Sequence, residues 1–124
     1  MHSLFEASDS LNMPFECFIY DTRVEQFPVR PHWHYFMEMI YMIDGTAEMY
    51  DSGNRYLVRS GDFILFHPKS IHSIFSVDNS PIRYAVLKYD LNHLNIKPTY
   101  APKLKELFKI AEQKKMPVFF SSET

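Results

Sequence analysis

Three histidines and one glutamate have the spacing expected of metal ligands or of the polar groups in a binding pocket. His32, His34 and Glu38 lie in the run HWHYFME, and His72 lies in the run PKSIH. Side chains alternate between the two faces of a strand, so the first three are expected on one face, with His72 supplied by another strand. Neutral imidazole and carboxylate are good ligands for Zn, Fe, Ni and Mn. Alternatively, the same four side chains line a polar pocket, where they hydrogen-bond to one another and to water.

Apolar side chains share the face predicted for these polar groups. Phe36, Ile40 and Met42 are expected to form an apolar wall beside the cluster, because small-molecule sites combine apolar lining with a few polar groups. The alternative is that all three are ordinary core residues. Arg30 could reach a ligand hydroxyl or carboxylate at the mouth of the pocket through its guanidinium group, or form a surface ion pair.

The opposite face of the same run is also apolar, which is unusual for a face in contact with solvent. It is expected to pack under a second sheet, a helix or another subunit. This face comprises Trp33, Tyr35, Met37, Met39 and Tyr41.

Short strands are the elements that would position these residues. Two β-prone runs, FECFIY and VEQFPV, are followed by a long strand predicted from His32 to Ile43, closed by the turn signal Asp44-Gly45. TAEMY and RYLVR flank DSGN as a predicted hairpin, and three further β-prone runs follow, DFILF, HSIFSV and IRYAVLKY. About eight strands without intervening helices predict an all-β fold, an antiparallel barrel or double-sheet jelly roll.

The two ends of the chain differ from this β-rich body, which spans residues 13–96. Residues 1–12 are polar and without period, and are expected to form a flexible arm or lid. Residues 97–124 form a C-terminal helical segment, in which Pro102 begins a helix and Pro117 ends it. Its apolar positions, at helical spacing, are Leu104, Leu107, Phe108 and Ala111. The apolar start of VFFSSET has no partner in sequence, so the chain is expected to be a piece of a longer protein.

Composition limits the remaining possibilities. A chain of 124 residues, 46% hydrophobic and 23% charged, suits a single globular domain. With Cys17 as the only cysteine, no internal disulfide can form, which favours a reducing compartment. The sequence lacks both a signal peptide pattern and an apolar run of the roughly 20 residues that span a membrane, so a cytoplasmic location is expected. The excess of acidic residues in the β-rich body argues against nucleic-acid binding by that part.

The pattern H-x-H-x3-E-x6-G, from His32 to Gly45, resembles the first motif of the cupin superfamily. Gly61-Asp62 through Pro68 to His72 resembles the second motif. The resemblance implies a cupin-type double-stranded β-helix, a jelly-roll barrel, followed by one C-terminal α-helix. Three features depart from the motifs: Lys69-Ser70 follows Pro68 where an enzyme cupin has a glycine, Ser76 replaces the usual asparagine, and Gln26 replaces a glycine.

The amino-acid sequence of both motifs is most similar to that of the N-terminal cupin domain of AraC-type transcription regulators. The resemblance covers roughly residues 14–116. That resemblance implies a non-enzymatic domain that senses a small-molecule effector, often a sugar, and contributes to a homodimer. DNA would be bound only through a C-terminal helix-turn-helix domain that is missing here. Many of these domains work without metal. The alternatives are a small metal-dependent cupin enzyme of the dioxygenase or isomerase class, with the His32, His34, Glu38 and His72 cluster as its metal site, and a purely structural dimerisation domain.

Overall fold

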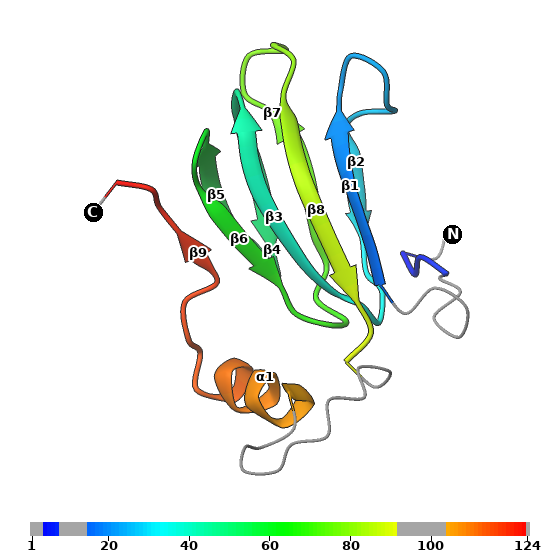
Figure 1. The fold of residues 1–124 in the computed structure, drawn as a ribbon, viewed down its shortest axis with the longest axis vertical. Coiled ribbons are helices and arrows are strands. Elements are labelled where there is room, and N and C mark those ends of the chain that lie inside the picture. The colour runs from blue at the N-terminus through cyan, green and yellow to red at the C-terminus, as the bar shows by residue number, and fades with distance from the viewer. Residues whose placement is uncertain (1–3, 8–14, 92–103, 124) are drawn as a thin grey trace.

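Two antiparallel sheets lie one behind the other in the computed structural model, which describes residues 4–7, 15–91 and 104–123 (Figure 1). The first sheet has five strands in the order β1 (Phe15–Asp21), β8 (Arg83–Tyr89), β3 (Met37–Asp44), β6 (Phe63–Phe66) and β9 (Phe119–Phe120). The second has four in the order β2 (Val29–His32), β7 (His72–Ser76), β4 (Thr46–Asp51) and β5 (Asn54–Arg59). One helix, α1 (Leu104–Gln113), lies at one end of this sandwich (Figure 1). The predicted all-β double-sheet fold is therefore confirmed.

The space between the sheets is filled by alternate residues of facing strands, as the period of two requires. Ile40 of β3, for example, pairs with Ile64 of β6 on one side and Val86 of β8 on the other, and all three are buried. The remaining core comes from both sheets: Met42, Ala47, Met49, Val58, Phe66, Ile74, Ile82 and Tyr84.

The predicted single strand from His32 to Ile43 is wrong. β2 ends at His32 in the four-stranded sheet, and β3 begins at Met37 in the five-stranded sheet, so the intervening residues cross from one sheet to the other. Alternating side chains cannot distinguish one long strand from two strands joined by a bend. Met37, predicted on the outward face, shares that face of β3 with Met39 and Tyr41, but at the start of the strand, opposite Tyr89, it is fully buried.

Two turns predicted from glycine are confirmed. Ser52 and Gly53 join β4 to β5 with φ angles of 50° and 87°, as a two-residue hairpin loop with positive φ at both positions requires. Gly45, with φ of 90°, ends β3 and leads into the other sheet. A Cβ atom there would lie 2.7 Å from Ile82 Cγ2, so the close approach also requires glycine.

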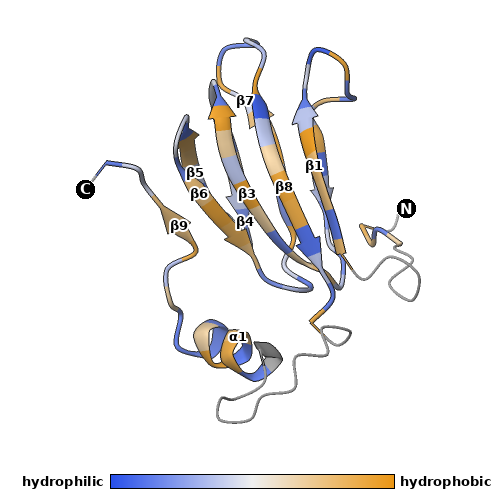
Figure 2. Ribbon diagram, in the orientation of Figure 1, coloured by the Kyte–Doolittle hydropathy of each residue, from blue (hydrophilic) through white to orange (hydrophobic). Residues whose placement is uncertain are grey.

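The outward face of the five-stranded sheet carries apolar side chains. Ile19, Tyr41 and Leu87 are exposed there, and the sheet register places them in neighbouring rows on β1, β3 and β8. Hydrophobic bands run through the same strands in Figure 2. This surface includes Met39 and Tyr41 of the predicted outward face, and within the described residues no second sheet covers it.

The C-terminal residues return to the barrel. β9 pairs with β6, with Phe119 opposite Ile64 and Phe120 opposite Phe63. The expectation that VFFSSET begins with apolar residues that lack a partner is therefore wrong. That partner lies more than 50 residues away in sequence, which a local pattern cannot reveal. The helix is confirmed from Leu104 onward; its predicted start at Pro102 lies outside the described residues.

Candidate functional site

Four predicted side chains meet between the sheets, although they come from separate parts of the fold. His32 ends β2, His34 lies in the crossing to β3, Glu38 is on β3, and His72 begins β7. One potential ligand atom from each lies within 4.8 Å of those of the others. The cluster forms because His32 and His72 face each other across the β2–β7 ladder, while the crossing chain brings His34 and Glu38 over from the other sheet.

Glu38 is at the centre of this His/Glu cluster. Its Oε2 atom lies 2.7 Å from Nε2 of His72 and 3.3 Å from Nε2 of His34. Glu38 is only 6% exposed, and the two histidines are 1% exposed. A carboxylate so deeply buried has to be compensated by nearby donors or positive charge.

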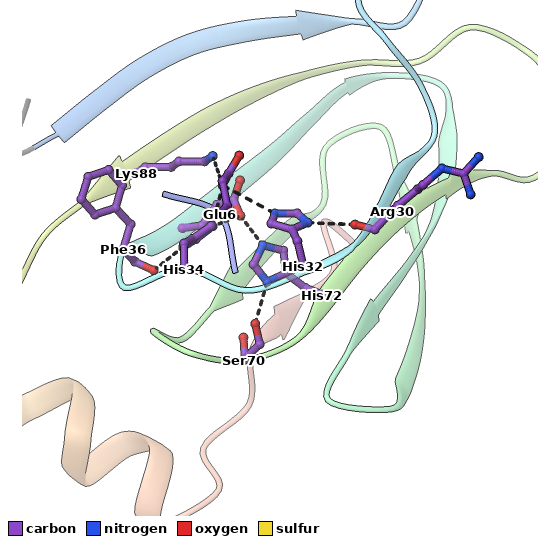
Figure 3. A network of polar contacts seen from close by, with 9 residues as sticks. Glu6, Arg30, His32, His34, Phe36, Ser70, His72 and Lys88 are labelled. Atoms are coloured by element: carbon purple, nitrogen blue, oxygen red, sulfur yellow. Dashed lines mark hydrogen bonds and ion pairs between the residues drawn. The ribbon is translucent and has the colours of Figure 1, made fainter. Parts of the chain in front are cut away.

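Backbone carbonyls orient all three imidazole rings. A carbonyl oxygen can only accept a hydrogen bond, so each Nδ1 atom that faces one must carry the ring proton. The Nδ1 donors and their acceptors are His32 with the Arg30 carbonyl at 2.9 Å, His34 with the Phe36 carbonyl at 3.1 Å, and His72 with the Ser70 carbonyl at 2.9 Å (Figure 3). In the neutral rings the Nε2 lone pairs then point at the cluster, an arrangement typical of metal-binding histidines.

The electrostatics favour the metal-binding forms of Glu38 and His32. Burial alone would raise the pKa of Glu38. Hydrogen bonds from His34 and His72 when these rings carry a proton on Nε2 as well, together with the charges of His72 and Lys88, hold that pKa well below its ordinary value. Burial lowers the pKa of His32, against a smaller opposing effect of its hydrogen bond to the Arg30 carbonyl. Ionised carboxylate and neutral imidazole are the forms that coordinate metals.

The donor set fits a divalent metal. Nε2 of His72 is buried without a well-aligned hydrogen-bond partner among the described residues, yet it lies 2.7 Å from a carboxylate oxygen. With the ring proton on Nδ1, two lone pairs face each other at that distance, which is repulsive unless a cation or a proton lies between them. His32, His34, Glu38 and His72 could therefore hold a metal ion in a three-histidine, one-carboxylate site.

A cavity of about 460 Å³ opens beside the cluster. Glu38, His32 and His72 form its polar end, together with Lys88 of β8. The apolar lining comes from both sheets and from the N-terminal residues: Leu4, Phe5, Phe18, Tyr20, Val29, Pro31, Ile74, Tyr84 and Val86. Volume and lining are those of a small-molecule site.

Residues Leu4–Ala7, hereafter the N-terminal segment, lie at this cavity. Phe5 forms a parallel bridge with Trp33, where the Trp33 amide donates to the Leu4 carbonyl and the Glu6 amide donates to the Trp33 carbonyl, both at 2.8 Å. The Glu6 carboxylate reaches the open side of the cluster, beside Lys88 (Figure 3). This part of the predicted arm is thus paired with the barrel.

The predicted apolar wall lies elsewhere. Phe36, Ile40 and Met42 are fully buried, and none of them lines the cavity, which favours the alternative that they are core residues. Ile40 and Met42 share the face of β3 that carries Glu38, but they lie further along the strand, in the core between the sheets. Arg30 lines the cavity, but its guanidinium group points away from the cluster (Figure 3).

Sequence reasoning missed Glu6, Lys88 and the apolar lining from β8. Tyr84, Val86 and Lys88 alternate along that strand, so a lysine at the end of an inward apolar row was the available signal. His67, which follows β6, is buried.

Comparisons with solved structures identify the class of fold. A conserved protein of unknown function from Streptococcus pyogenes is 14% identical, with a TM-score of 0.56 over 63% of this chain and 66% of that protein. A cupin protein from Bacteroides fragilis is 17% identical, with a TM-score of 0.56 over 73% and 77% of the two chains. FeII HppE is 11% identical, with a TM-score of 0.54 over 61% of this chain and 43% of its own. At these identities the likeness concerns the fold, which is that of a cupin.

The family follows from the sequence match. Residues 14–95 match the AraC-like ligand binding domain, so the chain belongs to that family and is an effector-sensing domain. No curated protein matches the chain. Among the described residues, no helix is long and apolar enough to cross a membrane.

Proposed function

We propose that the domain senses a small-molecule effector bound in the 460 Å³ cavity, without chemical conversion of that effector. The observation that carries this proposal is a largely apolar cavity that ends at an oriented His/Glu cluster and is flanked by the N-terminal segment. An effector can change the state of the domain only if it binds one state more tightly than another. The N-terminal segment supports such a difference, because it can be paired with Trp33 or released from it.

Thermal denaturation in the presence of a small-molecule panel tests the proposal. A ligand at 100 times its Kd stabilises the folded state by about 2.7 kcal/mol, which is a shift of several degrees for a domain of this size. Neutral monosaccharides belong in the panel because a sugar is the family's common effector. Val86→Trp, which fills the cavity from β8, should abolish the shift, and a shift that persists would place the ligand elsewhere. Recovery of the ligand unchanged after incubation separates a sensor from an enzyme.

We propose further that a divalent transition metal, Zn, Fe, Ni or Mn, occupies the cluster. When bound, such an ion would offer an open coordination position to an oxygen of the effector. Elemental analysis of protein purified without added metal should give about one ion per chain, lost in His34→Ala. His67→Ala is the matched control, since His67 lies outside the cluster. Metal well below stoichiometry in all three proteins would leave the cluster as a polar pocket lining.

The wider context is proposed from the family resemblance. The domain would act in the cytoplasm as a homodimer and reach DNA through a separate C-terminal domain. Exposed apolar side chains support self-association: Leu107 and Ile110 on α1, and Ile19 and Leu87 on the outward sheet face. Sedimentation velocity on Leu107→Lys and Ile19→Lys should show which surface is used. A monomeric wild-type chain at 100 µM would contradict the dimer.

A further inference from the structure

All four residues of the N-terminal segment are exposed, so few of its contacts with the barrel are buried. Two backbone hydrogen bonds join it to Trp33, and the centroid of the Phe5 ring lies 4.7 Å from that of Trp33 and 5.4 Å from that of Tyr35. Phe5 and Glu6 both remain substantially exposed. Segments with so few buried contacts open readily, so a ligand can displace this one at small cost.

One oxygen atom of this segment marks a position for an anion. Oε2 of Glu6 lies 3.4 Å from Nζ of Lys88, 3.9 Å from Nε2 of His32 and 4.0 Å from Nε2 of His34. A single carboxylate oxygen therefore meets both the cavity's lysine and the open side of the cluster.

The two members of the Glu6–Lys88 pair differ in their burial. The Glu6 side chain is 45% exposed and can return to solvent easily, whereas the Lys88 side chain is 13% exposed and lines the cavity. Release of Glu6 would leave a largely desolvated ammonium group, 5.9 Å from the centre of the Phe18 ring. Glu38 lies opposite Lys88 in the β3–β8 ladder, but its carboxylate already faces His34 and His72. Loss of the Glu6 carboxylate would therefore weaken the compensation of the Lys88 charge, which favours an anion as the group that displaces Glu6.

We infer that the Glu6 carboxylate occupies the position that a carboxylate of the effector takes when it binds. The effector is then a small carboxylic acid with an apolar body, and its binding releases the N-terminal segment from Trp33. This inference rests on the proposed sensing function and names the chemical class of its ligand. The ammonium group of Lys88 can pair with a ligand carboxylate as it pairs with that of Glu6, and the guanidinium group of Arg30 points away from this position (Figure 3). The apolar side chains of Phe18, Ile74 and Val86 would pack against the rest of the molecule.

A neutral sugar fits this position less well. Its hydroxyl groups carry no charge to replace Glu6 beside Lys88, and most of the cavity lining offers no hydrogen-bond partner. In the wild type, Glu6 also acts as a tethered competitor, since a short tether gives an effective concentration in the millimolar range. A carboxylate ligand should consequently bind more tightly once Glu6 is neutralised.

Trp33 gives a direct readout, because it is the only tryptophan in the chain and Phe5 packs on it. The probes are hexanoate, hexanamide and hexan-1-ol, which share one chain length and differ in their polar group. Each is titrated into the wild type, Glu6→Gln, Lys88→Met and the exposed control Glu123→Gln, with Trp33 fluorescence and thermal denaturation recorded together. Phe5→Ala, which loosens the segment without a change of charge, gives the fluorescence of the released state.

Three results are expected. Hexanoate binds at least about 10-fold more tightly than hexanamide and moves the Trp33 signal towards that of Phe5→Ala, because it alone pairs with Lys88. Glu6→Gln tightens hexanoate binding about 5-fold and Glu123→Gln does not change it. Lys88→Met removes the preference for hexanoate over hexanamide while the protein stays folded in the melting curve.

Other outcomes overturn the inference and leave the sensing function to be judged separately. Equal affinity for hexanoate and hexanamide would show a ligand site without preference for an anion. Tighter binding of hexanoate with no change at Trp33 would separate anion binding from release of the segment and would refute the replacement of Glu6. If hexanoate does not bind but a neutral sugar shifts the melting temperature, the cavity senses ligands of another class.

Discussion

Two buried carboxylates, Glu38 and Asp62, lie at opposite ends of the β3–β6 pair and are stabilised in different ways. Glu38 is 6% exposed and Asp62 is 4% exposed. The Asp62 carboxylate accepts hydrogen bonds from two backbone amides, that of Arg59 at 2.8 Å and that of Ser122 at 2.9 Å. Glu38 faces the imidazole nitrogens of His34 and His72.

The difference lies in whether the partners can change. A backbone amide always carries its proton, so Asp62 has permanent donors and needs nothing from solution. The Nε2 atom of a neutral imidazole oriented through Nδ1 carries no proton, so Glu38 depends on a bound cation or on added protons. Asp62 therefore ties Ser122 to the barrel, while Glu38 belongs to the cluster proposed to hold a metal ion.

The largest expected effect is the loss of metal affinity when Glu38 is replaced. Glu38→Gln should weaken Zn²⁺ binding at least about 100-fold, because a neutral amide is a poor ligand and loss of even an outer-shell group costs about 10–100-fold. Competition with a chromophoric chelator measures the affinity. The metal-free variant should melt close to the metal-free wild type, since glutamine is isosteric and relieves the desolvation of a buried charge. An affinity equal to that of the wild type would remove Glu38 from the metal site.

Replacement of Asp62 should have the opposite effects, a loss of stability without a loss of metal affinity. Asp62→Asn should lower the free energy of unfolding by about 1–3 kcal/mol, because the amide group would turn an N–H donor towards a backbone N–H. Urea denaturation measures the loss, and Zn²⁺ affinity should not change. The control is Asp78→Asn in an exposed turn, which should stay within about 0.5 kcal/mol of the wild type. A loss of metal binding in Asp62→Asn would contradict the separation of the two regions.

Local patterns in the sequence predicted much of the fold. Alternating β-prone runs predicted the strands, and Ser52-Gly53 predicted the β4–β5 hairpin, because both depend on neighbouring residues. Two features depend on distant contacts and were predicted wrongly: the break between His32 and Met37, and the pairing of β9 with β6. Both features depend on how the two sheets close into a barrel. The spacing of apolar residues along the sequence does not reveal that closure.

The proximity of the four polar side chains was easier to predict than the lining of the cavity beside them. His32, His34, Glu38 and His72 were found because imidazole and carboxylate at such spacing rarely serve packing alone. The apolar wall was assigned to Phe36, Ile40 and Met42 because they share a face with the polar residues, but Tyr84 and Val86 of β8 line the cavity. Which apolar residues lie nearest the cluster depends on the packing of separate strands. Glu6 could not be predicted, since only the tertiary pairing of Phe5 with Trp33 brings it to the cluster.

The smallest expected effect is the pH dependence of the contribution that Asp62 makes to the free energy of unfolding. Burial alone would raise the pKa of Asp62, but the amides of Ser122 and Arg59 hold it below its ordinary value of 3.8. As the pH falls, the unfolded chain binds this proton first, so the stabilisation is present above the unfolded pKa and is lost as the pH falls through the folded one. The difference in unfolding free energy between the wild type and Asp62→Asn should therefore be greatest near pH 7 and should narrow below about pH 4. Urea titrations at pH 7, 5, 4 and 3 measure this difference, and a constant difference would show that the charge of Asp62 adds nothing to its hydrogen bonds.

A control with metal separates the two regions. Saturating Zn²⁺ at pH 7 should leave the difference in unfolding free energy between the wild type and Asp62→Asn unchanged, because Asp62 lies outside the His/Glu cluster.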